Sequence, residues 1–66
     1  MKTVSELKTP KHLVTWMIVQ QDERHKHWLS VLEIESGEET FTAHTEDYDQ
    51  AQDTFVLLVR KATVDM

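Results

Sequence analysis

The chain has 66 residues, no cysteine and a formal net charge of −5 at pH 7. This length suits one domain near the lower size limit for independent folding, and the absence of cysteine excludes disulfide bonds and cysteine-ligated zinc. The acidic balance argues against direct nucleic-acid binding, which needs a basic surface. The sequence lacks the run of about 18 apolar residues that a membrane-spanning helix needs and the apolar region of a signal peptide. We therefore expect a cytoplasmic protein without membrane contact.

Residues 1–10 precede the first strongly apolar segment, and we expect them to form a flexible N-terminal arm ahead of a single domain over residues 11–66. The run Thr3-Val-Ser-Glu6 matches a capping box, so a single helical turn is the alternative here. Pro10 would end such a turn, because proline lacks the amide hydrogen that a helix interior needs. A frayed terminus is the simpler prediction.

Three segments favour β-strands, because β-branched and aromatic residues are frequent in them and turn-forming residues are absent. They are residues 13–20 (LVTWMIVQ), 28–35 (WLSVLEIE) and 40–44 (TFTAH). Between the second and third segments, Gly37 is the only glycine of the chain. It indicates a tight hairpin turn over Ser36–Glu39.

A hairpin with this turn has a definite pairing across its two strands: Ile34 with Phe41, and Leu32 with Ala43. These pairs place apolar side chains on one face and glutamates and threonines on the other. The consistency of the two faces supports the hairpin and predicts an antiparallel meander.

An amphipathic helix is predicted after the third strand. The apolar residues recur at three- and four-residue steps, the spacing of one helix face: Tyr48, Ala51, Phe55, Leu58 and Ala62. Thr45 is the candidate N-cap. The apolar run Phe55–Val59 also fits a buried strand, but the periodic pattern spans about four turns and favours a helix. The predicted fold is α+β: a three-stranded antiparallel β-meander followed by one C-terminal amphipathic helix packed on one face (βββα).

One helix covers only one side of such a sheet. We expect it to cover Trp28, Leu32, Ile34, Phe41 and Ala43, with Val14, Trp16 and Ile18 from the first strand. The second side would then hold an apolar interface made of Leu13, Met17, Val19, Leu29 and Val31. An uncovered apolar patch usually marks an interface, so a structural homodimer through this face is one hypothesis. The register of the first strand stays open, and the N-terminal arm folding over the patch is the alternative.

Acidic residues are concentrated in one part of the chain, since no Lys or Arg lies between Glu33 and Asp53. The candidate partner-binding residues are Glu33, Glu35, Glu38, Glu39, Glu46, Asp47 and Asp49. Such a region suits a protein partner with a basic surface, because charge complementarity speeds encounter and selects partners. The first functional hypothesis is therefore a non-enzymatic, protein-binding regulator or inhibitor that masks a basic, nucleic-acid-binding surface of its partner.

Histidines are the only other residues that suggest chemistry. His25 and His27 alternate, and with His12 and His44 they are candidate metal ligands, but a metal site also needs further ligands and supporting hydrogen bonds. Exposed polar residues at a hairpin end are the simpler interpretation, and a metal-binding module is kept as an alternative. No phosphate-binding loop or nucleophile motif is present. We expect no enzymatic activity and no cofactor.

The strand–helix junction carries a pattern of its own. Trp28 opens a strand, Ala43-His-Thr45 leads into the helix, and Ala51 lies on the buried side of that helix. From Trp28 to Val59 this pattern resembles small phage-encoded inhibitor proteins, such as the T7-type inhibitor of bacterial RNA polymerase. The first predicted strand and the histidine-rich segment are not part of the resemblance. It implies a non-enzymatic protein that occludes a host enzyme through an acidic surface.

Overall fold

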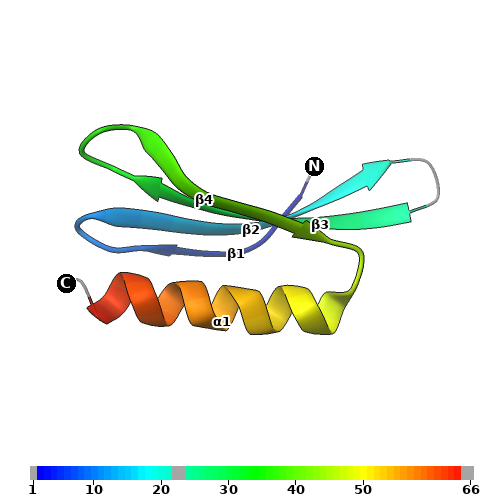
Figure 1. Ribbon diagram of the computed structural model, residues 1–66. Coiled ribbons are helices and arrows are strands. Elements are labelled where there is room, and N and C mark those ends of the chain that lie inside the picture. Colours follow the sequence, from blue (N-terminus) through cyan, green and yellow to red (C-terminus); the bar gives the residue numbers. More distant parts are fainter. Residues whose placement is uncertain (1, 22–23, 65–66) are drawn as a thin grey trace.

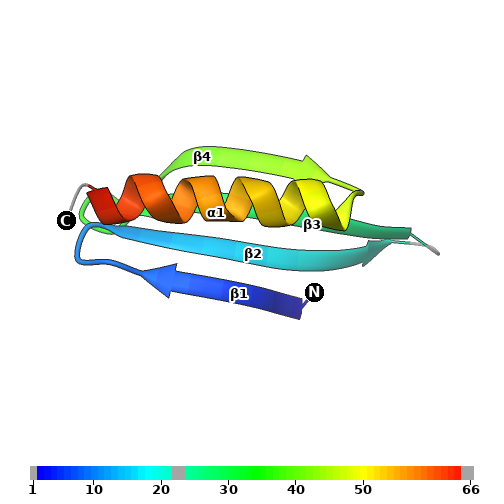
Figure 2. The same cartoon turned by 90° about the horizontal axis from the view of Figure 1, so that it is seen from below.

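The computed structural model describes residues 2–21 and 24–64. Its elements are β1 (Lys2–Lys8), β2 (His12–Gln21), β3 (Arg24–Glu33), β4 (Glu38–Thr45) and α1 (Tyr48–Val64). The strands form one sheet in the order β1-β2-β3-β4, and each pairs antiparallel with its chain neighbour. The helix lies lengthwise along one face of this sheet (Figures 1 and 2). The α+β class, the antiparallel meander and the C-terminal helix are confirmed, but the sheet has four strands instead of three.

The additional strand is β1, in the segment for which we expected a flexible arm. It pairs with β2 from Lys2 opposite Ile18 to Lys8 opposite Leu13. Thr9 closes the connection: its backbone N–H donates to the carbonyl of His12 at 2.8 Å, and its Oγ1 accepts from the N–H of His12 at 2.9 Å. Pro10 therefore lies in a tight turn between two strands, where it needs no amide hydrogen. The expectations of a mobile arm and of a helical turn were wrong.

The hairpin of β3 and β4 has a different register from the predicted one. The pairs are Val31 with Phe41 and Leu29 with Ala43. The turn is formed by residues 34–37, with Gly37 at a positive φ of 73° and its N–H bonded to the carbonyl of Glu33 at 2.8 Å. The turn lies earlier in the chain than predicted, and β4 has an extra residue at Thr40. Because the combined shift is an odd number of residues, the β3 side chains exchange faces.

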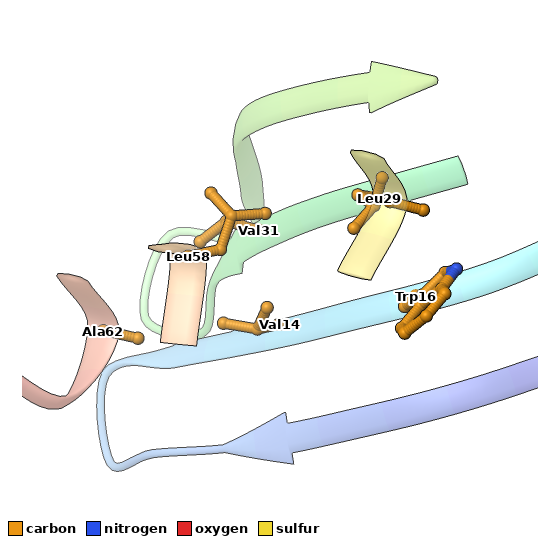
Figure 3. Close-up of a cluster of buried hydrophobic side chains, with 7 residues drawn as sticks. Val14, Trp16, Leu29, Val31, Leu58 and Ala62 are labelled. Carbon is orange, nitrogen blue, oxygen red and sulfur yellow. The ribbon is translucent and has the colours of Figure 1, made fainter. Parts of the chain in front are cut away.

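The core lies between the two central strands and α1 (Figure 3). Its buried members are Val14, Trp16, Leu29 and Val31 from the sheet and Ala51, Leu58 and Ala62 from the helix. Val14 and Leu29 are completely buried. The two alanines have short side chains, which let the helix backbone approach the sheet closely. The predicted apolar stripe of the helix is therefore the face that packs on the sheet.

The first turn of α1 is capped by Asp47 and not, as expected, by Thr45. The carbonyl of Asp47 accepts the N–H of Ala51 at 3.0 Å, and its Oδ1 accepts the N–H of Asp49 at 3.0 Å. This is the arrangement of an N-cap residue. Thr45 supports the cap from outside, because its Oγ1 accepts the N–H of Asp47 at 3.1 Å. Within the described residues α1 is not long and apolar enough to cross a membrane.

Two leucine substitutions, one in the core and one on the surface, test this packing. Leu29→Ala should lower the free energy of unfolding by about 2–5 kcal/mol, because it removes a completely buried side chain and leaves a cavity. The side chain of Leu57 is 58% exposed, so Leu57→Ala should change the free energy of unfolding by less than about 0.5 kcal/mol. Urea denaturation followed by circular dichroism measures both. Equal losses for the two variants would contradict this core.

Candidate functional site: two interaction surfaces

The sheet face opposite α1 is covered by no other element of the described chain (Figure 1). Side chains alternate along a strand, so the neighbours of the buried core residues in β2 and β3 point to this second face. We call it the open face. Its large apolar members are all half-buried: Leu13, Met17, Val19, Trp28 and Leu32. The indole of Trp28 stacks on the ring of His44, with centroids 5.7 Å apart.

The predicted apolar interface is placed only in part on the open face. Leu13, Met17 and Val19 lie there, as members of β2 that alternate with Val14 and the other core residues. Leu29 and Val31 do not: they are buried under α1, so their assignment to an interface was wrong. The physical reason is the register of the second hairpin, which turns these two residues toward the helix. It turns Trp28 and Leu32, expected under the helix, to the open face.

The strand register arranges the open face in rows that cross the sheet. Three rows run from β1 through β2 and β3 to β4: Lys8, Leu13, Leu32, Glu39; then Glu6, Thr15, Ser30, Thr42; then Thr3, Met17, Trp28, His44. The centre of these three rows is thus apolar or hydroxylic, and the next pair along β2 and β3 is Val19 with Lys26. The first row has a cation at one edge of the sheet and an anion at the other.

A second surface is formed by four glutamates around the β3–β4 turn. They are Glu33, Glu35, Glu38 and Glu39, and we call them the glutamate hairpin. Glu33 and Glu38 are direct cross-strand partners, an arrangement that destabilises a sheet because the like charges repel. The tip of this hairpin bends away from α1, beyond the neighbouring β1–β2 turn (Figure 1). The projecting hairpin thus carries four carboxylates, with Glu33 and Glu38 on the helix side of the sheet and Glu39 on the open face.

The other three predicted acidic residues lie at the opposite end of the molecule. Glu46, Asp47 and Asp49 belong to the connection between β4 and α1. The extended strand β4 separates them from the glutamate hairpin by roughly 23 Å. The structure therefore does not bring the seven acidic residues together. The Asp47 carboxylate already has a role in capping α1.

The four histidines are dispersed. His27 is buried on the helix side of β3, where its Nδ1 accepts a hydrogen bond from Nε1 of Trp16 at 3.1 Å. His25 is exposed, His44 lies on the open face, and His12 begins β2 beside Glu33. Over residues 2–21 and 24–64 no three His, Asp or Glu side chains are grouped to hold a metal ion. Sequence reasoning missed the buried role of His27. The signal for it was its two-residue spacing from Leu29 and Val31.

Two hollows lie between α1 and β4, because the helix packs mainly on β2 and β3. One has a volume of about 260 Å³ and is lined in part by Phe41 and Leu58. The other has a volume of about 290 Å³ and is lined in part by Ala43 and Thr54. Both are below the range of about 300–1,000 Å³ that is usual for small-molecule pockets. The open face and the glutamate hairpin are therefore the better candidates for a functional surface.

Two substitutions of Asp47 distinguish the effect of its charge from the effect of its N-cap hydrogen bond. Asp47→Ala should lower the free energy of unfolding by about 1 kcal/mol, because the N–H of Asp49 loses its acceptor. Asp47→Asn removes the same charge but keeps the acceptor, so it should change stability by only a few tenths of a kcal/mol. Thermal denaturation of both variants is the measurement. If Asp47→Asn destabilises as much as Asp47→Ala, charge and not capping is the important property.

Comparison with protein-family models, with curated proteins and with solved structures finds no match for this chain. A functional assignment therefore depends on the two surfaces themselves. One is a projecting group of carboxylates, and the other is an apolar sheet face with charged edges.

Proposed function

We propose that this protein is a small, non-enzymatic, protein-binding regulator or inhibitor. Its glutamate hairpin contacts a basic surface of a partner protein, of the kind that binds nucleic acid, and masks it. This action is the one implied by the resemblance to phage-encoded inhibitors, which occlude a host enzyme. It requires no cofactor and no catalytic group.

The observation that supports the proposal best is the direct pairing of Glu33 with Glu38. Two carboxylates opposite each other lower the stability of the hairpin. An uncharged or basic residue in place of either glutamate would remove the repulsion. Local violations of this kind are expected where a surface serves function instead of folding. A basic partner relieves the repulsion, so binding gains from an interaction that folding lacks.

The position of the hairpin suits this role. Glu35, Glu38 and Glu39 are exposed, while Glu33 is half-buried. A projecting group of like charges attracts an oppositely charged surface at long range, which raises the association rate. The other three acidic residues lie at the opposite end of the molecule, and the proposed contact does not include them.

A first prediction concerns stability. Glu38→Gln should raise the free energy of unfolding by about 0.2–1 kcal/mol at low salt, because the repulsion with Glu33 is removed. The gain should shrink in high salt, which screens exposed charges. Glu35→Gln is the matched control, since Glu35 lies in the turn without a cross-strand partner. Urea denaturation at two salt concentrations compares them. An equal effect of both substitutions would indicate that only net charge matters.

A second prediction concerns binding. The unsubstituted protein, immobilised as bait in a lysate of its native host, should retain a basic protein that is released by salt. Glu35→Gln/Glu38→Gln should weaken this retention by about tenfold or more, the equivalent of about 1.4 kcal/mol. Asp49→Asn/Asp53→Asn removes the same charge at the other end of the molecule and should leave retention unchanged. Mass spectrometry identifies the retained protein. Identical retention by all three baits would refute the role of the hairpin.

A further inference from the structure

The open face has the composition of a protein interface. Its three full rows cross all four strands, which span about 14 Å from β1 to β4. Its five large apolar side chains remain half-buried. A domain of this size without disulfides or metal commonly gains stability by association. The question is which molecule covers the face.

We propose that a second copy of this chain covers it, related by a two-fold axis that runs parallel to the strands above the gap between β2 and β3. Of the residues that carry this inference, only Glu39 also belongs to the glutamate hairpin, so Lys8→Glu, which leaves that hairpin unchanged, separates the two proposals. The axis exchanges β1 with β4 and β2 with β3, and it keeps each row of the open face at the same level along the strands. Each row therefore faces the reversed row of the second copy.

The charges at the two ends of the first row attract those of the same row when the second copy presents it in reverse order. Reversal brings Lys8 of one copy opposite Glu39 of the other, and this pair occurs twice in the dimer. Between the two pairs, Leu13 faces Leu32 of the second copy. Aligned sheets pack about 10 Å apart and are rotated by about 30°, a displacement that the long Lys8 and Glu39 side chains can span at the sheet edges.

The two rows that follow also match across this axis, whereas the Val19–Lys26 pair beyond them places Lys26 opposite Val19 of the second copy. In the third row Met17 faces Trp28 of the second copy, so a flexible thioether packs on an aromatic ring. In the middle row Thr15 faces Ser30 of the second copy, and these small side chains allow the two sheets to approach each other. An axis perpendicular to the strands would instead place β1 on β1 and β4 on β4. It would not pair Lys8 with Glu39, so the charges favour the parallel axis.

Lys8 and Glu39 have no direct contact within one copy. They lie on the two outer strands, three strand spacings or about 14 Å apart. Any strong energetic coupling between the two positions must therefore arise across the interface. This separation makes a charge exchange a clean test of the proposed axis.

The test is sedimentation equilibrium at several protein concentrations and low salt. The unsubstituted protein should dimerise reversibly. Lys8→Glu and Glu39→Lys should each weaken dimerisation by about tenfold or more, because each creates two like-charge pairs per dimer. A 1:1 mixture of the two variants should restore a dimer, since both pairs are then of opposite charge. The double variant Lys8→Glu/Glu39→Lys should also dimerise like the unsubstituted protein.

Matched controls are adjacent in the sequence or on the same strand. Lys2→Glu makes the same charge change on β1 opposite Ile18, on the helix side of the sheet. Glu38→Lys does so on β4 opposite Glu33. Both controls should leave the dimerisation constant within about twofold of the original value. Circular dichroism confirms that each variant is folded.

Three results would overturn the proposal. The first is that the unsubstituted protein sediments as a monomer at the highest concentration tested. A dimer whose single variants associate normally does not use these edges of the open face. A mixture of Lys8→Glu and Glu39→Lys that associates no better than either variant alone excludes the two-fold axis parallel to the strands.

Discussion

Close packing of α1 on the two central strands is the interaction on which the rest of the structure depends. Ala51 and Ala62 bring the helix backbone near the sheet, and Leu58 fills the space above Val14 and Val31 (Figure 3). Every buried apolar side chain of the described chain belongs to this single contact layer. The outer strands are held because they pair with β2 and β3, and both candidate surfaces lie where the helix does not reach.

The dimensions of the elements explain why so much surface remains. A helix with its side chains is about 10–12 Å wide, whereas four strands at about 4.8 Å spacing form a wider layer. One helix therefore covers β2 and β3 on one face and leaves hollows beside β4. The opposite face receives no cover from the described residues. Residues 13–19 of β2 are apolar except for Thr15, and because successive side chains point to opposite faces, this run supplies large apolar side chains to both faces.

Much of the fold could be predicted from the sequence, but the strand register could not. The periodic stripe ending at Ala62 was sufficient to identify the helix, because Phe55–Val59 is too short to explain its full length. The hairpin was harder. Pairing Ile34 with Phe41 and pairing Val31 with Phe41 both place apolar residues together, so composition cannot choose between them. The position of the turn and the extra residue at Thr40 decide, and both depend on the packing of the whole sheet.

The candidate surfaces were predictable to different extents. The acidic residues were visible as a charge pattern, but their division between two ends follows from the extended path of β4. The strand β1 was missed because its polar residues resemble a mobile terminus, and its pairing depends on a turn closed by the Thr9 hydroxyl. The row of Lys8 and Glu39 joins residues distant in sequence. Such a row emerges only once all three registers are known.

The two outer strands share an irregularity that has its own consequence. β1 has an extra residue at Val4 and β4 has one at Thr40, whereas the pairing of β2 with β3 is regular throughout. A bulge twists an exposed strand and interrupts its row of free hydrogen-bonding groups, so that another sheet cannot readily extend it. Both outer strands therefore carry a feature that opposes amyloid-like growth by strand addition.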